Sequence, residues 1–228
     1  MSASLVLITG ASRGIGAASA RRFSADGARV LRLARSAMEP LAGSVDVRVD
    51  LADPVDRQRA LDLISRDFGT PDVLISNAGA FLLAGLEDTS DALLREQLAI
   101  NLEAPLALAR HFLPAMKVRG SGTHLLVGSV ADWQAFPGNA AYAASKFGAR
   151  GLHEVLLAEC RGSGVRCTLI SPGPTDTTVW DPLDPDHRGD LPNRAEMLHP
   201  DDVAAAIHFA ATQPTRVQIE LIRLRASQ

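Results

Sequence analysis

Tyrosine, lysine and cysteine are scarce in this sequence, and long hydrophobic runs are missing. No apolar stretch approaches the roughly 18 residues of a membrane-spanning helix, and the first residues lack the charged segment of a secretion signal. The two cysteines, Cys160 and Cys167, are seven positions apart and have no metal-ligand spacing around them. We therefore expect a cytoplasmic protein with free thiols, without a membrane segment and without a metal site.

Charge is balanced and dispersed. Lysine and arginine together number 23 against 26 aspartates and glutamates, the net charge is −3, and the basic residues are not clustered. This distribution argues against nucleic acid as a partner. The chain has 228 residues, 46% of them hydrophobic, and no change of composition marks a linker, so the sequence predicts one domain over residues 1–228.

Tyr142 is the only tyrosine, and Lys146 is one of two lysines in a chain that uses arginine at 21 of its 23 basic positions. Four residues make about one helical turn, so in a helix the phenol and the ammonium share a face. A nearby cation lowers the pKa of a tyrosine from roughly 10 toward neutral pH, as general acid/base catalysis needs. A surface Tyr and Lys on an amphipathic helix is the alternative for this spacing alone.

A glycine-rich turn follows the first apolar run. Gly10, Gly14 and Gly16 have the spacing G-x-x-x-G-x-G and open a helical pattern. Glycines let the backbone approach a phosphate closely, and the free N–H groups at the start of a helix favour an anion. We expect a nucleotide phosphate site here, and a structural turn without a ligand is the alternative.

The choice of nucleotide depends on the end of the second predicted strand. An acidic residue there would bind the ribose 2′-hydroxyl of NAD, whereas an arginine accommodates the 2′-phosphate of NADP. The sequence has Arg35 at this place, Arg13 in the glycine turn as a second candidate, and Ser12 as a hydroxyl donor. These residues predict NADP(H) rather than NAD(H), and solvated surface arginines are the alternative.

Short apolar runs alternate with helical patterns along the chain. Strands are predicted at residues 4–9, 29–33, 45–49, 72–76, 123–128, 165–170 and 217–224. Helices are predicted from the glycine turn to about residue 25, over 54–68, from 89 for nearly thirty residues, from a cap at Asn139 to about 161, and from a cap at Asp201 to about 212. The pattern predicts an α/β fold, a Rossmann-like three-layer sandwich with a seven-stranded parallel sheet.

Small and polar residues stand at the carboxyl ends of several predicted strands, where open α/β sheets bind ligands. Asn77, Ala78 and Gly79 follow the fourth strand, and Ser129 follows the fifth. Asp50 follows the third strand, either as a cap for the next turn, which the sequence favours, or as a partner for an adenine amino group.

Asn101 lies among apolar residues in the long helical pattern, where asparagine is a poor helix former. Its amide either accompanies a local kink, which Pro105 supports, or has a functional purpose, and the spacing favours neither. His111 has no acidic or nucleophilic partner within sequence reach, so we expect a structural role for it.

Residues 178–200 show neither a helical nor a strand period and are rich in proline and aspartate. They predict a polar loop, and we hypothesise that residues 178–193 form a mobile lid. Trp133, Phe136 and Trp180 could line an apolar substrate pocket or be ordinary packing.

With these features in order, the chain resembles the short-chain dehydrogenase/reductase family across nearly its full length. Residues 9–16, TGASRGIG, match the family's T-G-x-x-x-G-x-G coenzyme turn, and residues 77–79 match the last three letters of N-N-A-G, with Ser76 in place of the first asparagine. Pro172, Gly173 and Thr177 match P-G-x-x-x-T. The residues that fall where the family has its catalytic tetrad are Asn101, Ser129, Tyr142 and Lys146.

The resemblance implies a role for each member of the tetrad. Ser129 would hydrogen-bond the substrate oxygen, and Tyr142 would give or take its proton. Lys146 would lower the tyrosine pKa and hold the nicotinamide ribose, while Asn101 would hold a water that links Lys146 to solvent through the kinked backbone. Thr177 would meet the nicotinamide carboxamide.

The predicted cofactor-binding residues come from both halves of the chain, with a coenzyme half at about 1–120 and a catalytic and substrate half at about 121–228. They are Gly10, Ser12, Arg13, Gly14, Ile15, Gly16, Arg35, Asp50, Leu51, Asn77, Ala78, Gly79, Tyr142, Lys146, Pro172, Gly173, Thr175 and Thr177.

The sequence therefore predicts an NADP(H)-dependent oxidoreductase that interconverts a carbonyl and an alcohol on a small molecule by hydride transfer. A catalytically idle nucleotide-binding regulatory protein is the alternative, and the intact tetrad argues against it. An epimerase or dehydratase of nucleotide sugars would need more than the about fifty residues that follow Thr177. The resemblance also implies a homodimer or homotetramer that pairs through the helices carrying Asn101 and Tyr142, with the last strand joining at a sheet edge.

Overall fold

A seven-stranded sheet with the order β3-β2-β1-β4-β5-β6-β7 forms the centre of the computed structural model, which describes residues 3–227. All neighbouring strands pair in parallel. The strands are β1 (Leu5–Thr9), β2 (Arg29–Ala34), β3 (Ser44–Arg48), β4 (Val73–Ser76), β5 (Gly122–Val127), β6 (Val165–Pro172) and β7 (Leu221–Leu224). The predicted seven-stranded parallel sheet is confirmed.

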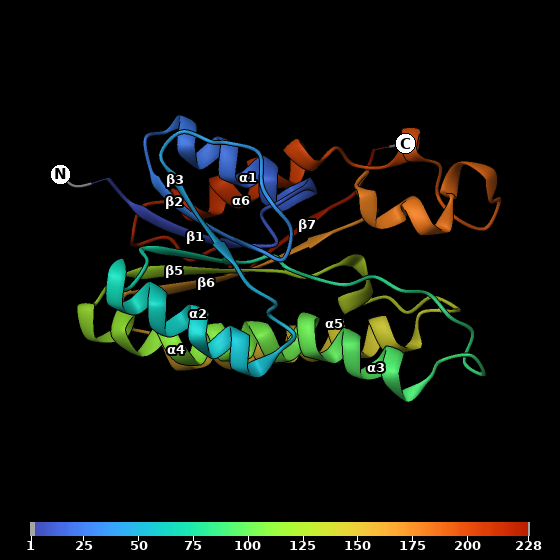
Figure 1. Ribbon diagram of the computed structural model, residues 1–228, viewed down its shortest axis with the longest axis horizontal. Coiled ribbons are helices and arrows are strands. Elements are labelled where there is room, and N and C mark those ends of the chain that lie inside the picture. The colour runs from blue at the N-terminus through green and yellow to red at the C-terminus, as the bar shows by residue number, and fades with distance from the viewer. Residues whose placement is uncertain (1–2, 228) are drawn as a thin grey trace.

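Helices cover both faces of this sheet, as the predicted three-layer sandwich requires. They are α1 (Gly14–Ala25), α2 (Pro54–Asp67), α3 (Asp91–Leu98), α4 (Ala104–Arg119), α5 (Ala140–Cys160) and α6 (Pro200–Ala211). Figure 1 shows α1 and α6 on one face of the sheet and α2, α4 and α5 on the other. Within residues 3–227, none of the helices combines the length and apolarity that crossing a bilayer requires.

The central strands are apolar on both sides because each side packs against a helical layer. Alternate residues of a strand point to opposite faces, so Leu7 and Leu74 join the cluster with α2 and α4, while Ile8 and Ile75 join the cluster with α1 and α6. The strand order reverses between β1 and β4, and the connections leave these two strands in opposite directions. The carboxyl ends of β1 and β4 therefore border a crevice, which is where open α/β sheets bind ligands.

The long helical pattern after residue 89 is interrupted by a π-helical segment, Ala99–Glu103, which separates α3 from α4. Such a segment inserts an extra residue into the helix and changes its direction. Asn101 lies inside it and is buried. Asn101 therefore does accompany a local irregularity of the helix, which was one of the two explanations for an asparagine at this position.

Two predicted boundaries are wrong. Strand β7 begins at Leu221 rather than at residue 217, because the side-chain amide of Gln218 takes both backbone groups of Cys167, at 2.5 and 3.3 Å, in place of a ladder pair. Helix α6 is capped by His199 rather than by Asp201, which lies in its first turn. Asp202 accepts a hydrogen bond from the backbone of His199 at 2.8 Å, so the cap is reciprocal.

Two other predictions need smaller corrections. Asn139 does precede the first residue of α5, but its side chain makes no cap and instead accepts a hydrogen bond from the N–H of Phe136 at 3.4 Å. The segment from residue 178 to 200 contains three short 3-10 turns, Thr178–Leu183, Pro185–His187 and Arg194–Glu196. It is therefore a folded excursion with local turns rather than a structureless loop.

Candidate functional site

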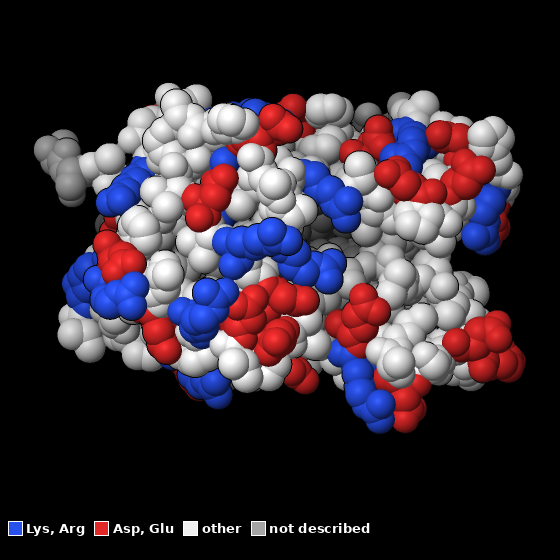
Figure 2. Space-filling view, in the orientation of Figure 1, with Lys and Arg blue, Asp and Glu red and all other residues white. Residues whose placement is uncertain are grey.

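A cavity of about 1340 Å³ opens at the carboxyl ends of the central strands. It appears in Figure 2 as a hollow beside a ridge of basic side chains. This volume exceeds that of an ordinary small-molecule pocket, as a site for a dinucleotide and a substrate requires. Every residue that the sequence predicts as catalytic or cofactor-binding lines the cavity, with the single exception of Gly16.

The glycine turn at the start of α1 has no space for side chains. A Cβ on Gly10 would lie 2.8 Å from the Cα of Ala78, and one on Gly14 would lie 2.9 Å from Cγ2 of Thr177. Gly10 and Gly14 also have φ angles of +66° and +55°, which favour glycine. Among residues 3–227, no side chain caps the first turn of α1, so its N–H groups can meet an anion. The turn fits the pyrophosphate of a dinucleotide.

Gly16 lies behind this turn rather than in the cavity. A Cβ there would come within 2.3 Å of the carbonyl oxygen of Gly10. Its contribution is the close packing of α1 against the end of β1.

Thr9, which the sequence analysis did not single out as a site residue, ties the two sides of the crevice together. Its hydroxyl accepts hydrogen bonds from the backbone N–H groups of Asn77 and Ala78, both at 2.9 Å. The Asn77 amide in turn donates to the carbonyl of Thr9 at 2.9 Å. Thr9 is the first residue of the coenzyme-turn motif, so the motif could have identified it as a residue of the site.

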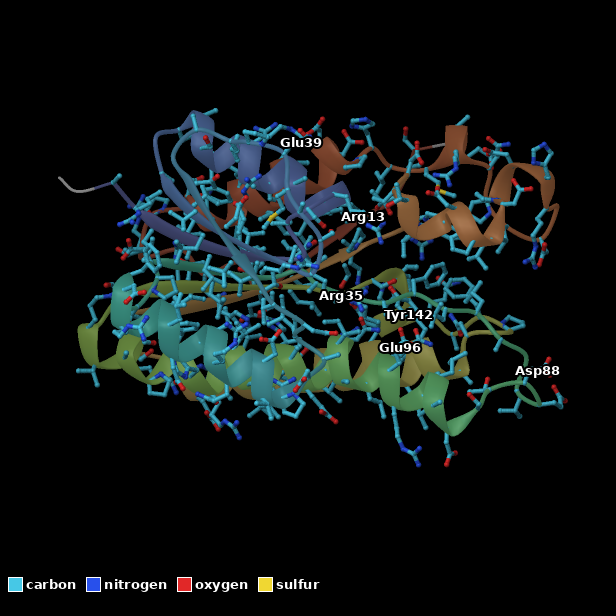
Figure 3. All side chains as sticks on the ribbon, in the orientation of Figure 1. Arg13, Arg35, Glu39, Asp88, Glu96 and Tyr142 are labelled. Carbon is cyan, nitrogen blue, oxygen red and sulfur yellow. The ribbon has the colours of Figure 1, made fainter. Side chains whose placement is uncertain are left out.

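Basic side chains gather at the nucleotide end of the cavity. Arg13 and Arg35, which Figure 3 labels, both line the cavity. Arg35 extends into solvent with 72% of its side chain exposed and lies 3.9 Å from the carboxylate of Asp50. Ser36, which the sequence analysis missed, adds a hydroxyl to the same lining.

Asp50 acts as the turn cap that the sequence favours. Its Oδ1 accepts a hydrogen bond from the N–H of Ala52 at 3.0 Å. Asp50 and its neighbour Leu51 also line the cavity, so the carboxylate lies within reach of a bound nucleotide.

Lys146 is buried on the same face of α5 as Tyr142. Its Nζ donates to the carbonyl oxygen of Val127 at 3.1 Å and lies 5.8 Å from the centre of the Tyr142 ring. Burial lowers the pKa of Lys146 to about 8, and the charge of Asp132 opposes that shift. The ammonium therefore persists at neutral pH but is close to losing its proton.

The predicted lowering of the Tyr142 pKa is wrong for this structure. Burial raises the pKa of Tyr142 to about 12, the Ser129 hydroxyl acts in the opposite direction, and the charge of Asp132 adds to the rise. The Lys146 ammonium, which donates to Val127 and lies over the ring at 5.8 Å from its centre, does not reverse the shift. Phe81 packs edge-on against the ring with 4.8 Å between centroids and covers one side of this half-buried residue.

Ser129 begins a 3-10 turn whose conformation is held by a buried carboxylate. The Ser129 hydroxyl accepts from the N–H of Ala131 at 3.1 Å, and Asp132 Oδ2 accepts from the N–H of Ser129 at 3.1 Å. Ser171 on β6 donates to the same oxygen at 2.5 Å. Nothing in the local sequence pattern identifies Asp132 or Ser171, since both act through contacts made only in the folded chain.

The second carboxylate oxygen of Asp132, Oδ1, is buried without a hydrogen bond from any described group. Asp132 as a whole is fully buried. The nearest cation is Arg150, whose Nη1 is 3.9 Å away. A buried carboxylate with one oxygen that accepts no hydrogen bond from a described group therefore lies three residues after Ser129.

Both the oxygen and the nitrogen of the Asn101 side-chain amide form hydrogen bonds within the protein. It exchanges two hydrogen bonds with the backbone of Ala80, at 2.9 and 3.0 Å, and donates to Ser145 Oγ at 3.0 Å. Its oxygen would lie 2.9 Å from a Cβ on Gly79. Asn101 thus ties the loop after β4 to the helix that carries Lys146.

The three candidate pocket aromatics have different positions. Trp180 is buried, lines the cavity and donates from Nε1 to the carbonyl of Thr175 at 3.1 Å, and Phe136 lines it while 40% exposed. Trp133 does not line the cavity, so its packing interpretation holds. His111 lies elsewhere, bonded to Ser65 Oγ at 2.7 Å, as its expected structural role requires.

Residues 4–188 match the family model described as short chain dehydrogenase, so the chain belongs to the short-chain dehydrogenase family. D-threitol dehydrogenase from Mycolicibacterium smegmatis is 34% identical over 222 residues, which cover 91% of this chain and 85% of that protein. An alcohol dehydrogenase from the archaeon Thermococcus sibiricus, solved with 5-hydroxy-NADP, has a TM-score of 0.85 and 26% identity over 99% of this chain and 97% of its own. A metagenomic short-chain oxidoreductase in complex with NADP has a TM-score of 0.81 and 29% identity, over 99% and 97%.

These comparisons confirm the predicted family and fold. The protein is an oxidoreductase of the short-chain dehydrogenase/reductase class, a class whose members use NAD(P) and act on small molecules.

Proposed function

We propose that this protein is an NADP(H)-dependent oxidoreductase that interconverts a carbonyl group and an alcohol by hydride transfer. The observation that carries the proposal is the position of Ser129, Tyr142 and Lys146 in one cavity with the glycine turn. Two similar proteins were solved with NADP or a derivative of it. Arg13 and Arg35 beside the cavity supply the positive charge that a 2′-phosphate needs.

When bound, NADP(H) supplies or accepts the hydride. The backbone of the glycine turn and the N-terminus of α1 would hold the pyrophosphate. Pro172, Gly173, Thr175 and Thr177 follow β6 and line the cavity, so they would hold the nicotinamide end. We assign coenzyme binding mainly to about residues 1–120 and substrate binding to about 121–228, within one domain.

Tyr142 would be the general acid and base. In reduction it donates the phenolic proton to the carbonyl oxygen, and in oxidation it takes the proton of the alcohol. With its pKa raised to about 12 by burial, the phenol carries the proton that reduction needs. The Ser129 hydroxyl would donate a hydrogen bond to the same oxygen and stabilise the charge that develops there.

Lys146 would hold the nicotinamide ribose and bring its positive charge to the site. Asn101 positions the helix of Lys146 through Ser145, and the π-helical backbone around it would hold a water beside the ammonium. This water would link Lys146 to solvent and replace the proton that Tyr142 gives away.

The proposal includes a homodimer or homotetramer formed through the helical face of α4 and α5. Leu106, Phe147 and Val155 expose 46%, 46% and 52% of their surface on these two helices. Sedimentation as a monomer at micromolar concentration would contradict it. Residues 178–193 are proposed to form a lid, which predicts slower amide exchange in this segment when ligand is bound.

A panel of aldehydes and ketones, followed by the absorbance of NADPH, tests the function. Tyr142→Phe keeps the ring and removes the proton, so it should bind NADPH with similar affinity and lose at least about a hundredfold in turnover. NADPH binding without turnover of any carbonyl, in wild type as in the variant, would instead support the regulatory alternative.

A further inference from the structure

One part of the cavity lining pairs an arginine with a glutamine. Arg225, just after β7, and Gln134, just after the 3-10 turn that begins at Ser129, both line the cavity. Nη2 of Arg225 donates to Oε1 of Gln134 at 2.8 Å. This bond turns the amide oxygen toward Arg225, and the NH2 group of Gln134 keeps its donors for a ligand.

The guanidinium of Arg225 is held in place although the side chain is exposed. It lies over the ring of Trp133 at 4.8 Å from the ring centre, and Arg223 lies over the same ring at 4.5 Å. Stacking on an indole and a bond to Gln134 orient the planar fork without using most of its N–H groups. Arg223 shares the ring but does not line the cavity, so only Arg225 presents its charge there.

Arg225 has no carboxylate partner within residues 3–227, which distinguishes it from Arg188. Arg188 also lines the cavity, but Asp190 neutralises it through two bonds at 2.7 and 3.0 Å. Glu96 and Glu196 are exposed lining residues whose carboxylates accept no hydrogen bond from a described group. Arg225 therefore presents to the cavity a positive charge that no carboxylate of residues 3–227 pairs with.

The strand register places this charge at a useful distance from the reacting group. Ser129 follows β5 and Arg225 follows β7, and β6 lies between them. The backbones of β5 and β7 are two strand spacings apart, which amounts to about 10 Å. The side chain of Arg225 extends over part of the distance to Ser129. Between them lies Gly173, whose N–H bonds the carbonyl of Leu224 at 2.8 Å and whose Cβ position is 3.8 Å from Cγ of Arg225.

We propose that Arg225 and Gln134 form a carboxylate-binding subsite, so that the substrates are small oxo acids and the corresponding hydroxy acids. This inference rests on the proposed function, since it places the substrate carbonyl at Ser129 and Tyr142. A planar fork and one amide match the two oxygens of a carboxylate, whereas a dianionic phosphate group would need more cations. The carboxylate would lie a few bonds from the reacting carbon.

The test compares oxo acids with their methyl esters, which keep the carbonyl and lose the charge. The probes are pyruvate, acetoacetate and 4-oxopentanoate, whose carbonyl groups lie at increasing distance from the carboxylate. With NADPH, at least one acid should exceed its ester by about tenfold or more in kcat/KM, the effect of one charge-assisted fork. Arg225→Gln should abolish that preference while changing kcat/KM for the ester less than about threefold.

Arg223→Gln is the matched control, because it removes a guanidinium from the same Trp133 ring but not from the cavity lining. It should keep the preference for the acid. Esters turned over as well as acids, or an Arg225→Gln variant that weakens both equally, would overturn the carboxylate subsite while leaving the oxidoreductase function intact.

If neither acids nor esters are reduced, calorimetry replaces kinetics. Protein loaded with NADP⁺ is titrated with acetoacetate and with methyl acetoacetate. Binding of the acid alone, lost in Arg225→Gln and kept in Arg223→Gln, supports the subsite even though the proposed reaction has failed for these compounds. Equal binding of acid and ester, or no binding of either, refutes it.

Discussion

The N–H of Ser129 donates to the carboxylate of Asp132 at 3.1 Å, and that carboxylate is fully buried. A serine proposed to touch the substrate is thus held by a negative charge that water does not reach. The same charge acts on Tyr142 and Lys146, whose pKa values it raises. Asp132 is therefore a positioning residue with an electrostatic effect on the site.

Asp132→Asn should shift the pH dependence of reduction to lower pH. The charge of Asp132 opposes the lowering of the Lys146 pKa, so its removal should let that pKa fall below about 8. The alkaline limb of kcat/KM, where the ammonium is lost, should move down by a measurable fraction of a pH unit. Ser171→Ala, which removes a hydrogen bond to the same oxygen but no charge, is the control. An alkaline limb at the same pH in both variants would show that Asp132 acts through structure alone.

Lys146→Met should increase stability at neutral pH while it impairs catalysis. Burial lowers the Lys146 pKa from 10.5 to about 8, so the charged form is less favourable in the folded chain than in the unfolded one. Removing the charge should raise the free energy of unfolding by on the order of 1–3 kcal/mol, after the loss of the bond to Val127. Urea unfolding at pH 7 measures this difference.

The sign of the pH effect provides a second check on Lys146. Between pH 8 and 10.5 the unfolded chain binds the lysine proton that the folded chain has lost, so the contribution of this group to stability rises with pH. The advantage of Lys146→Met over wild type should therefore shrink across this window. An advantage that does not change with pH would mean that the lysine keeps its ordinary pKa in the fold.

Gly16→Ala should disrupt both the fold and the coenzyme site. The added Cβ would come within 2.3 Å of the carbonyl oxygen of Gly10, so α1 must move away from the phosphate turn. We expect a lower melting temperature and at least about a tenfold loss of NADPH affinity. Fluorescence titration with NADPH measures the affinity.

The control for this substitution is Gly151→Ala in α5. Within one subunit, no atom of residues 3–227 lies within 4 Å of the Cβ position of Gly151, so the change should stabilise the subunit by about 0.5–1 kcal/mol through helix propensity. Equal tolerance of the two substitutions would contradict the close packing at Gly16.

Arg35→Gln should reduce the preference for NADPH over NADH. The arginine lines the cavity and is paired only loosely with Asp50, at 3.9 Å, so its charge is available to a 2′-phosphate. The ratio of kcat/KM for the two coenzymes should fall by about tenfold or more, since a charged hydrogen bond is lost for NADPH alone. Arg59→Gln, an exposed arginine of α2 outside the cavity lining, should leave the ratio unchanged. A wild-type ratio near one would remove the proposed NADP preference.

The sequence by itself determined the succession of strands and helices along the chain and the glycine turn. It also determined that Tyr142 and Lys146 share one face of a helix. These features depend on local spacing, because periodicity and glycine geometry act over a few residues. Helix ends and the last strand were misplaced where a side chain replaced a backbone partner, as Gln218 does for Cys167.

Only the tertiary structure decided the electrostatics of the site and the part of the cavity lining at Arg225. The pKa of Tyr142 rises because the fold partly removes the phenol from water. The charge of Asp132 acts there because β5, β6 and α5 converge. Arg225 meets Gln134 across 91 residues of chain. Burial and contacts between distant segments have no local signature, since both are set by how the helical layers close over the sheet.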